Sequence, residues 1–185
     1  MKAILFIILM TLFSQNASAH RQVEGGVSGG GGNLLSPTPP KEIQDPREIR
    51  AIIKGSKFLL KKFINAKYSL FKSGSMDSES LRMYSVLFAD NDDNLHEAME
   101  EIALDIKLDE PCFDRDGVEH DGSTLNQKRH SICISAFSIA KKCDKEEVPL
   151  QSTALIFHEY SEVVGLSDID AIKLQKQVLD ELKVW

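Results

Sequence analysis

The chain has 185 residues, of which 22 are Lys or Arg and 28 are Asp or Glu, giving a formal net charge of −6. This acidic balance argues against nucleic-acid binding as a default function. The length suits one domain with one modest core rather than several domains.

The first nineteen residues have the pattern of a secretory signal peptide. Lys2 is followed by the apolar run "AILFIILMTLF" at 3–13, which is too short to span a bilayer, and then by "ASA" at 17–19. We expect cleavage after Ala19 and an exported protein, periplasmic or secreted. No later stretch is apolar for long enough to predict a transmembrane segment.

Residues 20–45 have the composition of a tether. "GGVSGGGGN" at 25–33 is dominated by glycine, and "LSPTPP" at 35–40 follows it. Ordering glycine costs much conformational entropy, and little apolar surface is available to offset that cost. We therefore expect a disordered segment that leads into a single domain over residues 46–185.

Residues 45–72 repeat apolar residues at helical spacing, and Pro46 suits a first helical turn, where its missing N–H costs nothing. Residues 41–72 hold nine Lys or Arg against three acids. Two interpretations stay open: a basic arm for an anionic surface such as membrane lipid, or a solvated helix face that complements an acidic body.

Residues 73–80 read as a loop, and the apolar stretch 81–89 after it fits either a helix or a strand. Residues 91–104 then predict a second helix, with polar residues that suit its N-terminal cap and acids in its first turn.

The pattern changes in the second half of the chain. Residues 104–112 and 131–139 are short, rich in Ile and bounded by turn residues, which predicts two strands. Residues 148–165 and 167–183 predict two further helices. The expected class is α+β: N-terminal helices, a small antiparallel strand pair, then two helices.

Three cysteines in an exported protein predict one disulfide and one leftover thiol. Cys112 ends one predicted strand and Cys133 lies in the next, so antiparallel pairing would bring them together. This bond would close a loop of about 20 residues, worth about 3 kcal/mol in the chain-entropy model. A Cys133–Cys143 bond is the alternative.

The segment "HEYSE" at 158–162 contains the residues that indicate chemistry. His158 and Glu162 are four apart on a predicted helix, so they project from one face and can hold one ion together. Glu159, next to the histidine, would lie close enough to act on water at that ion.

The run His158, Glu159, Glu162, Gly165 and Asp168 resembles the metzincin-type zinc peptidase motif HExxHxxGxxH/D, and also a group of exported bacterial proteins of unknown function. The resemblance implies a minimal zincin-like fold over about residues 104–185. It also implies that residues 131–139 supply the edge strand that pairs with an extended peptide or protein substrate.

By the same resemblance, His158 and Glu162 would be metal ligands, Glu159 the general base, and Asp168 (or Asp170) the third ligand. The expected cofactor is zinc or another divalent metal. Gly165 would permit the turn that returns the third ligand.

The sequence departs from the motif at Glu162, where the second histidine should stand. One imidazole and two carboxylates neutralise a divalent ion, which makes it a poorer Lewis acid and weakens hydrolysis. An oxygen-rich site also favours manganese or calcium over zinc. The sequence therefore predicts a metallopeptidase-like protein with a weakened or inactive site.

A second function stays open, a non-catalytic envelope protein that uses the same scaffold for binding or structure. Helix capping alone would explain part of the motif. Gly165 is a suitable C-cap, and Ser167 with Asp170 resembles a capping box.

Overall fold

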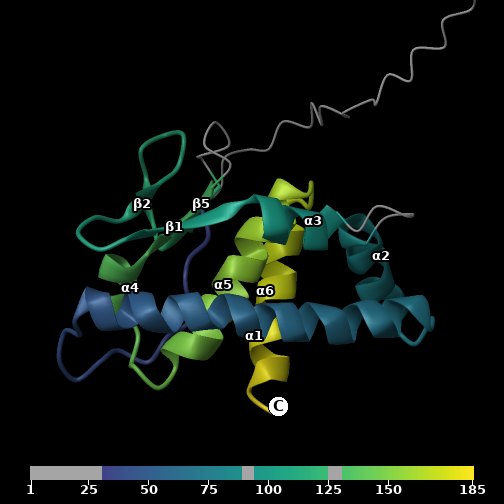
Figure 1. Ribbon diagram of the computed structural model, residues 1–185, viewed down its shortest axis with the longest axis horizontal. Coiled ribbons are helices and arrows are strands. Elements are labelled where there is room, and N and C mark those ends of the chain that lie inside the picture. The colour runs from purple at the N-terminus through teal and green to yellow at the C-terminus, as the bar shows by residue number, and fades with distance from the viewer. Residues whose placement is uncertain (1–30, 89–93, 125–130) are drawn as a thin grey trace, which may run out of the picture.

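The computed structural model describes residues 31–88, 94–124 and 131–185; the predicted signal peptide lies outside them. The class is α+β, as the sequence predicts. Within the described residues, no helix has the length and apolarity needed to span a membrane. The elements in chain order are α1 (Pro46–Lys72), α2 (Ser78–Leu87), α3 (Asn94–Glu101), β1 (Ala103–Lys107), β2 (Cys112–Phe113), β3 (Glu119–His120), β4 (Gly122–Ser123), β5 (Ser131–Ser135), α4 (Ala136–Lys142), α5 (Val148–Val163) and α6 (Asp168–Leu182) (Figure 1).

Helix α1 is the longest element and runs along the long axis of the molecule, with α5 and α6 behind it in the view of Figure 1. The helix begins where predicted, because the Asp45 carboxylate accepts a hydrogen bond from Arg47 N and Pro46 occupies the first turn. One face of α1 is buried through Ile49, Ile53, Ser56, Leu60, Phe63 and Ile64.

Helix α5 is the central element of the core, packed against both α1 and α6. Leu155, Phe157 and Tyr160 are fully buried, and Phe157 meets Phe63 of α1 edge to face at 6.3 Å between ring centroids. This helix also buries an unusual number of polar side chains. Such groups are costly to bury unless a partner or a function compensates for them.

The stretch 81–89, which fitted either a helix or a strand, contributes to helix α2. The predicted helix over 91–104 is shorter than expected in the described residues. It ends at Glu101, and the chain continues directly into β1.

A three-stranded sheet lies beside α4 and α5, with the order β1–β5–β4. Strands β1 and β5 are parallel, and β4 is antiparallel to β5. The predicted antiparallel pairing of these two Ile-rich segments is therefore wrong. The chain between them does not form a simple turn. It forms the β2–β3 hairpin and then β4, and β5 follows in the same direction as β1.

The second Ile-rich segment is a strand only up to Ser135. There the Ser135 hydroxyl accepts a hydrogen bond from Ser138 N at 3.0 Å and caps α4, so the residues expected to continue the strand are helical. The first Ile-rich segment divides likewise, because β1 ends at Lys107 and Cys112 opens β2.

The Cys112–Cys133 disulfide is present, as predicted, and joins β2 to β5 with 6.0 Å between the Cα atoms. The route to it differs from the expected one, since the two cysteines lie on strands of different sheets. Cys143 is free and buried, and burial raises the pKa of its thiol to about 12.

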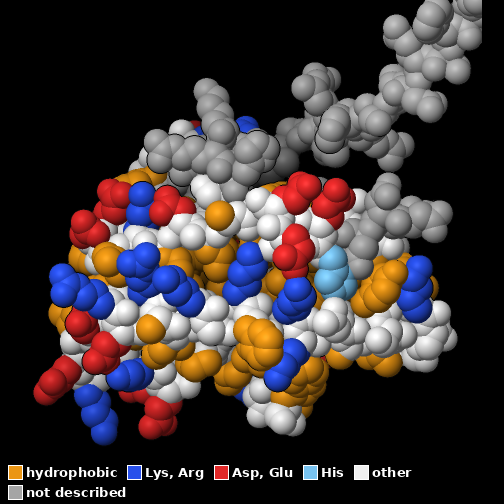
Figure 2. Space-filling view, viewed as in Figure 1, with side chains coloured by type: hydrophobic (Ala, Val, Ile, Leu, Met, Phe, Trp, Pro, Cys, Tyr) orange, Lys and Arg blue, Asp and Glu red, His pale blue; other side chains and the backbone are white. Residues whose placement is uncertain are grey.

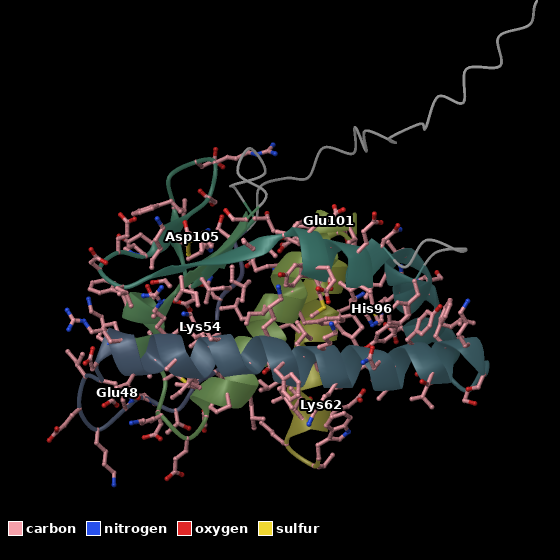
Figure 3. All side chains as sticks on the ribbon, in the orientation of Figure 1. Glu48, Lys54, Lys62, His96, Glu101 and Asp105 are labelled. Atoms are coloured by element: carbon pink, nitrogen blue, oxygen red, sulfur yellow. A yellow bond between two sulfur atoms is a disulfide. The ribbon has the colours of Figure 1, made fainter. Side chains whose placement is uncertain are left out.

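The lysines of α1 form a basic face, with acidic side chains gathered along the neighbouring edge (Figure 2). In Figure 3, Lys54 and Lys62 belong to α1, while Glu101 and Asp105 lie on the α3 and β1 side. Lys67 pairs with Glu181 of α6 at 2.6 Å, and Lys61 pairs with Glu100 of α3. These ion pairs favour the interpretation of α1 as a solvated face that complements an acidic body.

Residues 31–45 form no helix or strand, yet they lie against the domain. Thr38 N donates to Glu147 Oε2 at 3.0 Å, and Thr38 O accepts from Asp144 N at 2.7 Å. Gln44 Nε2 donates to Cys143 O at 2.6 Å. Residues 31–45 therefore pack against the domain, whereas the sequence predicted a disordered segment. Residues 20–30 of the predicted tether lie outside the described residues.

Candidate functional site

The site begins with two residues one helical turn apart on α5. His158 and Glu162 project from the same face, and His158 Nε2 lies 3.8 Å from Glu162 Oε2. Both side chains are fully buried. The spacing of these two residues in the sequence therefore gives the expected shared face.

The turn between α5 and α6 supplies a third group. Gly165 adopts φ 100°, a left-handed conformation that favours glycine, and its N–H donates to Glu162 O at 3.0 Å to close α5. Ser167 caps α6 by accepting a hydrogen bond from Asp170 N at 3.2 Å. Asp168 is thereby the first residue of α6 and faces back toward α5.

Asp168 Oδ1 lies 3.7 Å from His158 Nε2. His158, Glu162 and Asp168 each offer one potential ligand atom, and these three atoms lie within 4.8 Å of one another. Asp170, the alternative third residue, instead forms a two-contact ion pair with Arg82, at 3.0 and 3.2 Å.

The His158 ring is a buried polar group with unmet hydrogen-bonding capacity. Neither nitrogen has a hydrogen-bond partner of ordinary geometry among the described residues, although the backbone of Ala171 is close enough to favour the protonated ring. Burial lowers the pKa of His158 to about 4, which the charge of Asp168 only partly opposes. The ring is therefore neutral at physiological pH, the form that binds metals.

Glu162 is a second buried polar group with unmet hydrogen-bonding capacity. Neither carboxyl oxygen has a hydrogen-bond partner of ordinary geometry in the described part of the chain. Burial, and then the nearby charge of Asp168, raise the pKa of Glu162 to about 8. A divalent cation between these groups would compensate all of these costs at once, so the residues present fit such an ion.

Glu159, the residue after His158 in α5, is completely buried. Its Oε1 accepts a hydrogen bond from Gly32 N at 2.8 Å, while Oε2 has no described partner. Burial, followed by the charge of Glu162, raises the pKa of Glu159 well above its ordinary value. Carboxyl groups that act as catalytic acids or bases beside a metal site often have a raised pKa.

A second histidine flanks the site from the β2–β3 hairpin. His120 Nε2 lies 3.0 Å from Asp114 Oδ2, and its Nδ1 lies 3.3 Å from Asn33 Nδ2. Its charge, when present, adds to the forces that lower the pKa of His158. The motif in α5 gave no indication of this neighbour.

The expected edge strand is placed differently. The resemblance assigned that role to residues 131–139, but β5 is the central strand of the described sheet, and β4 is the strand next to the site. Gly122 of β4 packs against Glu159, so an ideal Cβ at this glycine would lie 2.6 Å from Glu159 Oε1.

Comparison with protein families, with curated proteins and with solved structures finds no match to this chain. The resemblance to metzincin-type peptidases accordingly rests on the residues of the motif alone.

Sequence reasoning missed Gly32 and Gly122 as members of the site. Gly32 contributes a backbone N–H, and Gly122 contributes the absence of a side chain next to Glu159. Neither contribution produces a side-chain pattern that can be recognised in the sequence. The only available signals were the glycine run before the domain and the Asp121–Gly122 pair, both of which are also typical of loops and turns.

Proposed function

We propose that this chain is an exported protein that binds a divalent cation through His158, Glu162 and Asp168. The observation that supports the proposal best is the convergence of three ligand-type atoms from two helices, within 4.8 Å of one another. One of them belongs to a buried histidine whose ring nitrogens make no hydrogen bond of ordinary geometry within the described residues. The Cys112–Cys133 disulfide is compatible with export, since disulfides persist mainly in oxidising compartments.

We further propose hydrolysis of peptide bonds as the chemistry of the site, in a weakened form. A bound divalent cation would supply Lewis acidity for the carbonyl and for water. Glu159 would take the proton from the attacking water and pass it to the leaving amine. Two carboxylates in the ligand set would neutralise the ion, so the rate should be well below that of a two-histidine site.

The second candidate is a non-catalytic binding or structural protein on the same scaffold. The complete burial of Glu159, and its bond to Gly32 N, favour this alternative. A general base that has no route to substrate does not catalyse a reaction on an external peptide.

One experiment addresses both candidates. Protein exported and purified without chelators is analysed for metal content, then assayed on a quenched fluorescent peptide library with and without added zinc or manganese. One equivalent of metal with slow, chelator-sensitive cleavage supports the weak peptidase. One equivalent without cleavage supports the scaffold, and protein that takes up neither metal contradicts the cation site.

A further inference from the structure

Residues 31–35, here called the strap, form no helix or strand and lie against β4 and α5. Gly122 N of β4 donates to Gly32 O at 2.9 Å, and Gly32 N donates to Glu159 Oε1 at 2.8 Å. The two peptide groups of Gly32 thus bridge the edge strand and helix α5. The bond from Gly122 N to Gly32 O joins main chain to main chain, which is the kind of contact that a peptide added to the edge of a sheet makes.

The rest of the strap is held by side chains of the domain. Leu34 N donates to Asp121 Oδ2 at 3.1 Å, and the Leu34 side chain is buried. Gln151 bonds both backbone groups of Leu35, accepting from its N–H at 3.2 Å and donating to its carbonyl at 2.9 Å. Asp121 and Gln151 thus supply a series of hydrogen-bonding groups for the main chain of the strap.

The space that the strap fills also leaves no room for a side chain at Gly32. An ideal Cβ on Gly32 would lie 2.6 Å from Glu159 Oε1 and 2.7 Å from Leu155 Cδ1. An ideal Cβ on Gly122 of β4 would lie equally close, 2.6 Å, to the same carboxylate oxygen. Because Glu159 is fully buried it has little room to move, so glycine is the residue that fits this position.

We propose that the strap is a built-in ligand of a peptide-binding groove between β4 and α5. The external partner of this groove is an extended peptide with glycine over Glu159 and a large apolar residue two positions later, where Leu34 is buried. While the strap is in place, such a peptide is excluded and Glu159 is covered. The purpose of the groove rests on the proposed function, but the strap contact itself requires no metal.

Amide hydrogen exchange in the mature chain tests the contact between the strap and the domain. The exchange is measured by NMR in the presence of a chelator. The amides of Gly32, Leu34 and Leu35 should exchange at least about tenfold more slowly than those of a free peptide of the same sequence. Gly32→Ala should return the exchange of all three amides toward the free rate. Gly55→Ala is the matched control, because a Cβ at Gly55 meets nothing within 4 Å.

Competition with a peptide in trans tests the partner. An acetylated peptide of residues 31–38, GGNLLSPT, in excess should accelerate exchange of the strap amides in the wild-type protein. The same peptide with Ala at the Gly32 position should bind at least about tenfold more weakly, because its methyl group meets Glu159. The wild-type arm decides the question even if Gly32→Ala does not fold.

Strap amides that exchange at the free rate, or an alanine peptide that competes as well as the glycine peptide, would overturn the proposal. None of these measurements uses a metal ion or hydrolysis. A protein that binds no cation would therefore leave the conclusion about the strap unchanged. Strap amides that exchange freely would likewise leave the conclusion drawn from a measured metal affinity unchanged.

Discussion

The Nε2 atom of His158 lies 3.7 Å from Oδ1 of Asp168, although the two residues belong to different helices. The turn that joins them is built from ordinary capping, with Gly165 at φ 100° and Ser167 as the N-cap. Capping and ligand placement are therefore not competing explanations of this segment. The same turn closes one helix, opens the next and returns a carboxylate to the histidine.

Replacing the unusual ligand should strengthen zinc binding. In Glu162→His, two imidazoles and one carboxylate would surround the ion and leave it a net charge of +1, with better Lewis acidity. We expect zinc affinity to rise by at least about tenfold, with peptide cleavage above that of the wild type. Competition with a chromogenic chelator measures the affinity, and a variant that binds no zinc would contradict the site.

The matched control keeps the ligands and removes the base. Glu162→His combined with Glu159→Gln should bind zinc as well as Glu162→His alone, while the gain in cleavage is lost. Equal cleavage by the single and the double variant would remove Glu159 from the chemistry.

Cation binding should depend on pH through Glu162. Because its pKa is raised to about 8, this carboxyl is protonated below that pH and the cation must displace the proton. Manganese affinity should rise about tenfold per pH unit from pH 6 to pH 8 and level off above it. His158 contributes no slope here, because its pKa is lowered to about 4. Calorimetry in two buffers of different ionisation enthalpy counts the released proton, and a flat affinity would contradict the assignment.

The metal-free protein should be destabilised by Glu162 as the pH rises. Its pKa increases from 4.5 to about 8 on folding, so the folded state loses stability through that window, while below pH 4.5 both states are protonated. Glu162→Gln should therefore stabilise the chelated protein at pH 8 by more than about 1 kcal/mol, and have little effect near pH 4. Thermal unfolding measures this difference. Asp170→Asn, which instead breaks the Arg82 pair, should give no stabilisation.

The disulfide and the export signal are tested by mass. Exported protein should begin at His20, with Cys112 joined to Cys133 and Cys143 free. Removing the bond with Cys112→Ser and Cys133→Ser should cost about 2–4 kcal/mol of unfolding free energy. The raised pKa of Cys143 predicts slow alkylation in the native state. Three free thiols in exported protein would contradict this account.

Local patterns in the sequence predicted α1, α5 and α6 well, but they left α2 undecided between helix and strand and assigned most of α4 to a strand. The apolar spacing in α1 and the capping at Asp45 are short-range features, and they determine that helix whatever surrounds it. The direction of β5 relative to β1 could not be predicted in this way. It depends on the path of the intervening chain, whose described part contains three strands of two residues each, too short to recognise from a sequence pattern.

The same distinction between short-range patterns and long-range contacts applies to the site. The spacing of His158 and Glu162 on one helix, and the turn at Gly165, could be read from the sequence. The strap could not, because composition alone indicated the entropic cost of ordering glycine and not the contact that offsets it. That contact is a single backbone N–H of Gly32 directed at a buried carboxylate, and only the tertiary fold brings the two together.

Calorimetric titration of the chelator-stripped mature protein with manganese and with zinc tests the central claim most directly. The account predicts one cation per chain, with binding weakened at least about tenfold in His158→Ala, which removes a ligand, and in Asp168→Asn, which removes the charge of one. Asp170→Asn should bind as the wild type does, since that carboxylate belongs to the Arg82 pair. A wild-type protein that binds neither cation, or a His158→Ala protein that binds them equally well, would contradict it.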